Sequence, residues 1–172
     1  MRRSSRWRRC WLRRRWRRSD SMIAAFPTLR KHEVSPSTAR WDFGFGLSYT
    51  QFAFKELKVE TRRQEGEDNI IEVEVTVQNT GTVAGAEVVQ VYVEDVEASV
   101  WRPWKELKAF EKIFLQPGES KVVKSRMLEN YALSFWDTGS KQWVAEKGDF
   151  KVHVGELSVP LVLQEAFCWT GL

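Results

Sequence analysis

Acidic side chains at alternate positions are the first residues in this chain that could do chemistry. Glu72 and Glu74 lie two residues apart in a predicted strand, which places their Cα atoms about 6.6–6.8 Å apart on one face. Two nearby carboxyls can act as an acid–base pair when burial raises the pKa of one of them. We expect both on the solvated face, where burial cannot do this, and any alternating strand offers the same spacing. We therefore interpret them as part of a wet sheet surface.

The other titratable residues do not form a recognisable site either. Glu94, Asp95 and Glu97 are interpreted as an acidic loop at the end of a strand. His32 lies in a linker-like stretch, and His153 alternates with apolar residues, so we expect it to be exposed. Two isolated histidines and two cysteines near the chain ends do not match zinc-ligand spacing. We predict no catalytic residue, no metal site and no cofactor in this chain.

Trp101 and Trp104 are the strongest candidates for contact with a ligand or partner. They lie in a long connection, and aromatic side chains of this kind stack on sugar rings or mark interfaces. Arg102 lies between them, and we expect Arg102 and Lys105–Glu106 to hold the loop through surface ion pairs, each worth little. The alternative is that one or both tryptophans fold back onto the domain.

The stretch Ile71–Asp95 organises the elements that must position these residues. Apolar and polar side chains alternate across Ile71–Gln78 and again across Val88–Glu94, which is typical of half-buried strands. Gly81 and Gly85 lie in the turn region between them. Two strands cannot bury their apolar faces on each other alone, so the rest of the chain must supply a second layer.

Strand signals continue on both sides of this stretch. A change of apolar phase near Lys55–Glu56 predicts a β-bulge, Gln116–Glu119 predicts a tight turn, and Glu129–Leu133 predicts one helical turn. Other strands are expected at residues 107–115, 120–128, 135–137, 142–145, 149–155 and 161–163. The pattern predicts an all-β, immunoglobulin/fibronectin type III-like β-sandwich of about seven strands.

The N-terminal part has a different composition. The first 20 residues hold ten Arg and one Asp, so the net charge of +4 conceals a basic segment in front of a mildly acidic remainder. We interpret residues 1–40 as a disordered Arg/Trp-rich extension and linker, residues 41–51 as a junction segment and residues 52–165 as the sandwich. A basic arm for nucleic acid or an anionic membrane is the alternative. The segment lacks the apolar run of a signal peptide, and the chain lacks one long enough to span a membrane.

Five segments in a fixed order resemble a known family. They are FGFGLSYTQF (43–52), VTVQNTGTVAGAEVVQVYV (75–93), RPWKELKAFEKIFLQPGES (102–120), LSFWD (133–137) and GDFKVHVG (148–155). Together they resemble the C-terminal fibronectin type III-like domain of family 3 glycoside hydrolases, the β-glucosidase and β-xylosidase group. Trp104 departs from the pattern, which has a smaller aliphatic residue there.

The resemblance implies a structural role. In this family the nucleophile and the acid/base lie in upstream barrel and α/β domains, so we expect this chain to be a fragment that lacks both residues and is inactive alone. It would brace catalytic domains that hydrolyse O-glycosyl bonds, and those domains would be its partners. The first segment resembles the junction to the middle domain, so the resemblance adds Phe43, Phe45 and Tyr49 to Trp101, Arg102 and Trp104 as interface residues.

Other functions stay open at this stage. A free-standing module could bind carbohydrate, such as glucan, or protein through Trp101 and Trp104. A nucleic-acid binder would use the basic residues 1–18, and we expect no specific nucleic-acid partner. Parent enzymes of the family are often secreted, but the sequence assigns no localisation to this chain.

Overall fold

The computed structural model describes residues 41, 43–63 and 68–170, so the predicted extension at residues 1–40 lies outside the described part. The strands are β1 (Phe52–Arg62), β2 (Ile70–Asn79), β3 (Gly85–Asp95), β4 (Glu106–Leu115), β5 (Ser120–Leu128), β6 (Phe135–Asp137), β7 (Gln142–Ala145), β8 (Gly148–Val154), β9 (Leu157–Leu163) and β10 (Phe167–Trp169). One short helix, α2 (Glu129–Leu133), precedes β6.

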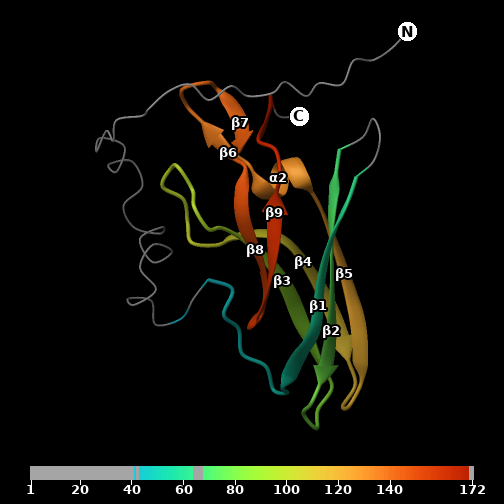
Figure 1. The fold of residues 1–172 in the computed structure, drawn as a ribbon. Coiled ribbons are helices and arrows are strands. Elements are labelled where there is room, and N and C mark those ends of the chain that lie inside the picture. Colours follow the sequence, from blue (N-terminus) through green and yellow to red (C-terminus); the bar gives the residue numbers. More distant parts are fainter. Residues whose placement is uncertain (1–40, 42, 64–67, 171–172) are drawn as a thin grey trace.

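Two antiparallel sheets form the body of the molecule (Figure 1). One has the order β1-β2-β5 and the other has the order β4-β3-β8-β9. A third, small sheet of order β10-β7-β6 stands at the end of the body away from the start of β1 (Figure 1). The all-β sandwich class predicted from the sequence is confirmed.

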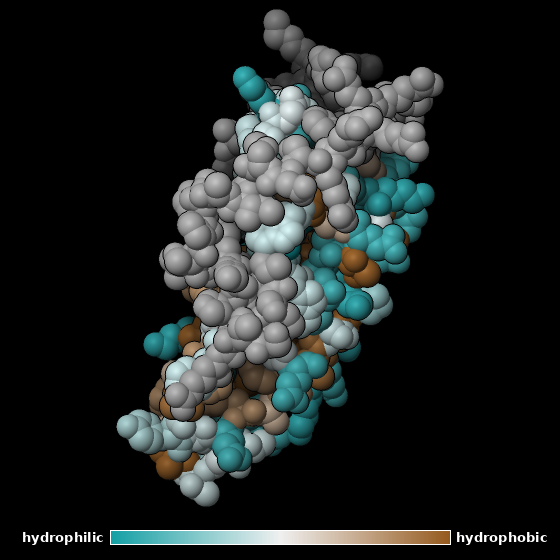
Figure 2. All heavy atoms as spheres, turned by 90° about the vertical axis from the view of Figure 1, so that its left-hand side faces the viewer, coloured by the Kyte–Doolittle hydropathy of each residue, from teal (hydrophilic) through white to brown (hydrophobic). Residues whose placement is uncertain are grey.

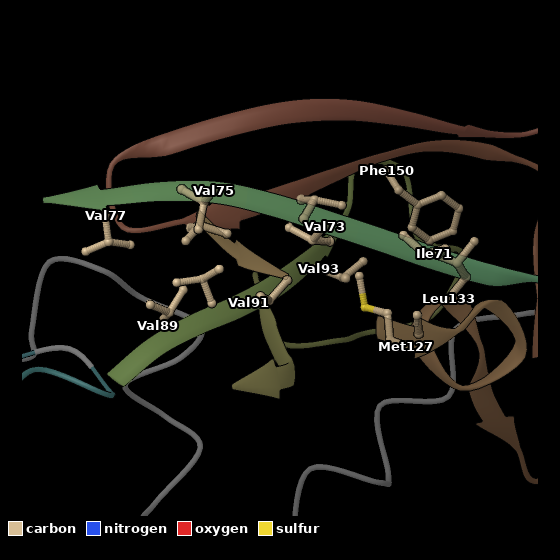
Figure 3. Packing of buried hydrophobic residues seen from close by; sticks show 14 of the residues in the cluster. Ile71, Val73, Val75, Val77, Val89, Val91, Val93, Met127, Leu133 and Phe150 are labelled. Atoms are coloured by element: carbon tan, nitrogen blue, oxygen red, sulfur yellow. The ribbon is translucent and has the colours of Figure 1, made fainter. Parts of the chain in front are cut away.

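The core lies between β2 and β3, as the alternation predicted. On β2 the side chains of Ile71, Val73, Val75 and Val77 are at most 1% exposed, and they face the buried valines of β3 across the sandwich (Figure 3). Met127, Leu133 and Phe150 close the same cluster. Burying side chains of this size stabilises the fold by about 1.5–3 kcal/mol each. The alternation of apolar and polar side chains is therefore enough to decide which face of each sheet turns toward the core.

Three local features predicted from the sequence are also confirmed: the β-bulge, the tight turn and the helical turn. The register of β1 against β2 shifts between Lys55 and Lys58, and Glu56 takes a φ of 55°, which is the predicted bulge. Gly118 has a φ of 76° in the predicted turn, where the Glu119 N–H donates to the Gln116 carbonyl at 3.0 Å. The predicted helical turn is α2.

The two sheets of the sandwich contain seven strands, as the sequence predicted. Three further short strands among the described residues, β6, β7 and β10, form the small sheet at its end. Strand β9 begins at Leu157, earlier than the predicted Leu161, and β10 was not predicted. A strand of three residues shows too little alternation to be recognised from sequence, because its pairing partner, not its own pattern, defines it.

Candidate functional site

The outer surface of the sheet β4-β3-β8-β9 is rich in aromatic side chains. Because the valines of β3 point inward, Gln90 and Tyr92 point outward. The register places Phe110 opposite Gln90 and His153 opposite Tyr92. Phe110 and Phe114 of β4 are 65% and 59% exposed. We call this outer surface, with the segments that lie over it, the aromatic face.

The junction segment crosses the aromatic face with its backbone fixed. Gln90 Nε2 donates to the Gly44 carbonyl at 2.9 Å, and the Tyr92 hydroxyl lies 3.2 Å from the Phe43 carbonyl oxygen. Gly44 has a φ of +82°, and a Cβ there would come within 2.0 Å of Gln90 Oε1 and 2.4 Å of the Tyr92 hydroxyl. Only glycine lets the backbone approach this closely.

The aromatic side chains of this segment point away from the body of the domain. Phe43 is 66% exposed, Phe45 is 56% exposed, and Tyr49 is fully exposed. Figure 2 views the molecule from the left-hand side of Figure 1, and where described atoms are visible, brown hydrophobic ones reach the surface between hydrophilic ones. The three residues predicted from the junction therefore lie on a fixed backbone with largely exposed rings, of which Phe45 stacks on Trp41 with the ring centroids 6.2 Å apart.

Thr50 fixes the end of the junction segment where it enters β1. Its hydroxyl donates to Asn79 Oδ1 at 2.7 Å, and the Gly81 N–H donates to the same oxygen at 3.0 Å. A Cβ on Gly81 would lie 2.2 Å from Thr50 Oγ1, and one on Gly85 would lie 2.8 Å from Thr50 Cγ2. We call Asn79, Gly81 and Gly85 the Thr50 socket.

Asn79 makes the socket rigid. Its side chain is inaccessible to solvent, and its Nδ2 donates to the carbonyls of Val83 at 2.8 Å and Leu115 at 3.2 Å. All polar atoms of this buried amide therefore have partners, as burial requires. The sequence had shown NTG only as a turn, whereas the structure shows that it also holds a distant segment.

The connection between β3 and β4 is built around Arg102. Its side chain is only 7% exposed, and its guanidinium bonds to Asp95 at 2.9 Å and Glu106 at 3.2 Å. It also reaches the Leu133 carbonyl and lies 5.6 Å from the centre of the Phe135 ring. The ion pairing was predicted, but the expectation of weak surface pairs was wrong because the guanidinium is buried against Leu133 and Phe135.

The two carboxylates of this clamp differ in pKa. Burial raises the pKa of Asp95 above its usual value, in spite of the neighbouring Arg102 charge. Burial also acts to raise the pKa of Glu106, but Lys108 and Arg102 outweigh it and hold that pKa below 4.5. Glu106 is thus the better stabilised anion of the pair, because it has two cationic neighbours.

The two candidate tryptophans have different surroundings. Trp104 is 49% exposed and packs at 5.9 Å against His153, while Lys105 Nζ lies 4.9 Å from Trp104 and 5.0 Å from Tyr92. Trp101 is 64% exposed, and no aromatic ring among the described residues stacks on it. Trp104 therefore leans on the aromatic face, and Trp101 projects from the clamped loop.

His153 is not exposed as the sequence predicted. Its Nε2 lies 2.7 Å from Glu94 Oε2, and its side chain is only 18% exposed. The prediction was wrong because the outer face of β8 is not bare, since Trp104 and Glu94 cover the ring. Glu94 belongs to the acidic cluster, whose first two members thus have cationic or imidazole partners.

The outer surface of β1-β2-β5 is a charged face. Glu72 pairs with Arg62 at 2.7 Å and with Arg126 at 2.8 Å, and Glu74 pairs with Lys124. The hydrogen bond from Lys124 lowers the pKa of Glu74, whereas a general acid needs a raised one. Both carboxylates belong to a ladder of ion pairs with exposed cations, but their own exposure differs. The side chain of Glu74 is 34% exposed and that of Glu72 only 13%, so the wet surface expected for both is found at Glu74 and not at Glu72.

The described part of the chain holds neither a metal-ligand cluster nor a membrane-spanning helix. No three His, Cys, Asp or Glu side chains converge on a possible metal position within residues 41–170 where they are described. In the same residues, no helix is long and apolar enough to cross a bilayer.

Known proteins similar to this chain are larger enzymes. The sequence model of the fibronectin type III-like domain family matches residues 87–158. Thermostable β-glucosidase B of Acetivibrio thermocellus is 45% identical over 141 residues, covering 82% of this chain and 18% of that protein. Probable β-glucosidase I of Aspergillus niger is 40% identical over 151 residues, covering 83% of this chain and 18% of that protein.

A solved structure also matches this chain over only a part of its own length. The β-glucosidase of Kluyveromyces marxianus in complex with glucose superposes with a TM-score of 0.72 at 36% identity, over 83% of this chain and 18% of that one. The chain thus spans about a fifth of the length of the relatives that it matches. In those relatives, the matching region is one part of a longer chain.

Proposed function

We propose that the chain is a non-catalytic structural module of a family 3 glycoside hydrolase, because residues 87–158 match the fibronectin type III-like domain family and the similar proteins are β-glucosidases. The module braces the catalytic domains of a β-glucosidase-like enzyme that hydrolyses O-glycosyl bonds. Residues 41–51 are the junction to those domains, and residues 52–165 form the bracing domain.

The structural observation that carries this proposal is the aromatic face. Phe43, Phe45 and Tyr49 extend from a backbone fixed by Gln90 and the Thr50 socket. Fixing a segment while leaving its rings in water has a cost unless a partner covers them, and exposed aromatic patches mark interaction sites. A neighbouring domain is a partner that would cover them permanently.

The clamped loop supports the same interface. Arg102 faces inward and positions Trp101 and Trp104 on either side of it. A buried ion pair orders the loop before any partner arrives, which reduces the entropy lost on docking. Arg102 in this proposal is a positioning residue, and the two tryptophans make the contact.

A chimeric enzyme tests the proposal. In β-glucosidase B of Acetivibrio thermocellus, the matching region would be replaced by residues 41–170 of this chain, and thermal unfolding and aryl β-glucoside hydrolysis would be measured. We expect the chimera to fold and hydrolyse the glucoside. Replacing Phe43, Phe45 and Tyr49 together by Ser should lower its Tm and its activity, because the interface loses its apolar contacts.

Matched controls separate the interface from general damage. Val122 and Leu128 are exposed on β5, in the other sheet, so the pair Val122→Ser/Leu128→Ser should leave the chimera unchanged. Equal behaviour of the two sets would contradict the proposal. Aryl β-glucoside hydrolysis by the purified 172-residue chain alone would also contradict it.

A second candidate function rests on Trp101. A bare indole on a loop held by a buried guanidinium could bind a glucan or a protein directly. Retention of the chain on insoluble β-glucan that disappears in the double variant Trp101→Ala/Trp104→Ala would favour this function over bracing. Retention unaffected by the double variant would exclude these residues as a sugar site.

A further inference from the structure

Three tryptophans form a row across the small sheet, and the proposed interface does not use them. Trp136, Trp143 and Trp169 lie directly opposite one another on β6, β7 and β10. The rings of Trp143 and Trp169 stack, with centroids 5.8 Å apart and planes 24° apart. Trp136 meets Trp143 edge to face, at 5.7 Å and 72°.

The row is anchored at one end and open at the other. Trp169 Nε1 donates to the oxygen of the buried Ser134 at 3.1 Å, and Trp143 is half-buried between its two neighbours. Trp136 is 47% exposed. The adjacent row of the same sheet includes Val144, which is nearly inaccessible. The stack is therefore tied to the body of the domain and presents one accessible ring at its tip.

The chain around that ring is polar. Strand β6 ends at Asp137, whose carboxylate accepts hydrogen bonds from the N–H groups of Gly139 at 3.1 Å and Ser140 at 2.9 Å. Lys141 and Gln142 complete the turn and return the chain to β7. This turn is therefore ordered by its own hydrogen bonds.

A polar surround argues against a protein partner at this position. Anchor residues of protein interfaces are normally ringed by contacts that exclude water. The exposed large apolar residues of the described chain do not include any other member of the β6–β7 hairpin. A single indole ring beside polar groups suits instead a ligand that has one apolar face and many hydroxyl groups.

We propose that Trp136, supported by Trp143 and Trp169, is a contact site for a sugar ring of a β-linked gluco-oligosaccharide. The C–H face of a glucopyranose can stack on the indole while its equatorial hydroxyls reach the polar turn. The choice of a glucose-based ligand rests on the proposed function, whereas the site itself rests on the tryptophan row.

The test uses the purified 172-residue chain in affinity electrophoresis through gels that contain soluble mixed-linkage β-glucan, with α-linked dextran as the control. We expect β-glucan to retard the wild-type chain. Trp136→Ala should weaken the apparent affinity by about tenfold, the loss expected when one aromatic stacking contact is removed. Trp136→Phe keeps a stacking ring and should retain most of the affinity.

The double variant Val122→Ser/Leu128→Ser, on the exposed face of β5 in the other sheet, is the matched control and should migrate like the wild type. Circular dichroism and thermal unfolding would establish that each variant is folded, which is expected because Trp136 is half exposed. Absence of retardation of the folded wild type would overturn the proposal. So would retardation that survives Trp136→Ala, equal losses in the Ala and Phe variants, or a loss confined to the double variant.

The two proposals can fail separately. The bracing role is measured by the stability and activity of the chimera, to which Trp136 variants should make little difference. The sugar contact is measured by retardation of the chain alone. A stable, active chimera with no retardation would overturn only the sugar site.

Discussion

The two outer faces of the sandwich obey the same alternation but have different chemistry. On the charged face, outward side chains pair within their own sheet, as Glu72 does with Arg62 and Arg126. On the aromatic face, outward side chains such as Gln90 bind backbone from a segment outside the sheet. The acidic side chains of the charged face find their partners within the same sheet. The aromatic face, in contrast, carries rings that no described residue covers, such as that of Tyr49.

This difference separates what makes the fold from what makes the function. The inward residues of both sheets are apolar, and together they supply the buried area that stabilises the domain. Only the outward residues distinguish the two sheets. On the aromatic face, polar side chains bind a segment from outside the sheet. We therefore infer that this face, and not the charged one, contacts a neighbouring domain.

The largest effect is expected at the loop clamp. Arg102→Ala would leave Asp95 and Glu106 without their shared buried cation, so we expect the free energy of unfolding to fall by about 3 kcal/mol. Arg126→Ala on the charged face removes a cation that is 69% exposed and should cost about 0–1 kcal/mol. Urea unfolding of both variants checks the difference.

Arg102→Lys refines this test. Lysine keeps the charge but cannot bond to both carboxylates in the planar geometry of a guanidinium, so it should recover only part of the lost stability. If Arg102→Ala and Arg126→Ala have equal effects, the clamp is no different from a surface ion pair and the contrast between the two faces is lost.

The next largest loss of stability is expected at Asn79, which faces the core, and not at its neighbour Gln78, which faces the charged surface. Asn79→Ala would leave the Val83 and Leu115 carbonyls and the Gly81 N–H without the amide that bonds them, at a cost of about 2 kcal/mol. Gln78→Ala removes only a contact with Lys55 on the charged face and should change stability by less than about 0.5 kcal/mol.

Hydrogen exchange locates the damage. In Asn79→Ala, amides near Thr50 should exchange faster, because Thr50 loses its acceptor. In Gln78→Ala they should not change. Protection near Thr50 that survives Asn79→Ala would show that the Thr50 socket does not hold the junction segment.

The sequence predicted most of the body of the fold because the body follows a repeating rule. Val73, Val75 and Val77 are buried as alternation requires, and the bulge at Lys55 is visible as a change of phase. The start of β5 at Ser120 follows from the turn residue Gly118, whose positive φ ends the preceding connection. Each of these predictions depends on neighbours within a few positions.

The surroundings of the candidate residues depend on distant contacts, and there the sequence was insufficient. His153 was expected in water and is covered by Trp104, which is 49 positions away in the sequence. Arg102 was expected at the surface and is enclosed by Leu133 and Phe135. The tryptophan row was missed because β10 joins β7 from the far end of the chain. No local period reports such contacts.

A third test compares two glycines with positive φ. Gly118 has a φ of +76° in a turn with open space around it, so Gly118→Ala should cost about 1 kcal/mol from backbone strain alone. Gly44→Ala adds a collision with Gln90 and Tyr92. Because the junction segment can lift away, we expect that variant to make residues 43–49 more susceptible to limited proteolysis, with little change in global stability.

Combined urea unfolding and limited proteolysis distinguish local release of the segment from global destabilisation. Global destabilisation without local release in Gly44→Ala would mean that the segment is part of the cooperative core. In that case, the junction segment unfolds together with the core. The aromatic face would then differ from the charged face only in the types of residue that it exposes.

The smallest effect is a dependence on pH at Glu106. Lys108 and Arg102 hold its pKa below the usual 4.5 against the opposing effect of burial, so the folded state binds a proton there less readily than the unfolded state. The stabilisation is therefore fully present above about pH 4.5 and is lost as the pH falls through the lower folded-state pKa. Urea unfolding between pH 3 and pH 7 should show Glu106→Gln less stable than the wild type at neutral pH, by about 1 kcal/mol or less.

The gap between wild type and Glu106→Gln should close toward the acid end, because the wild-type carboxylate is then protonated and resembles the amide. Glu74→Gln is the matched variant on the charged face, where the pKa of Glu74 is also lowered, mainly by Lys124. Solvent screens that exposed pair, so its gap should be smaller at every pH. A larger gap for Glu74 would reverse the comparison, because stability would then depend more on the exposed ladder than on the enclosed clamp.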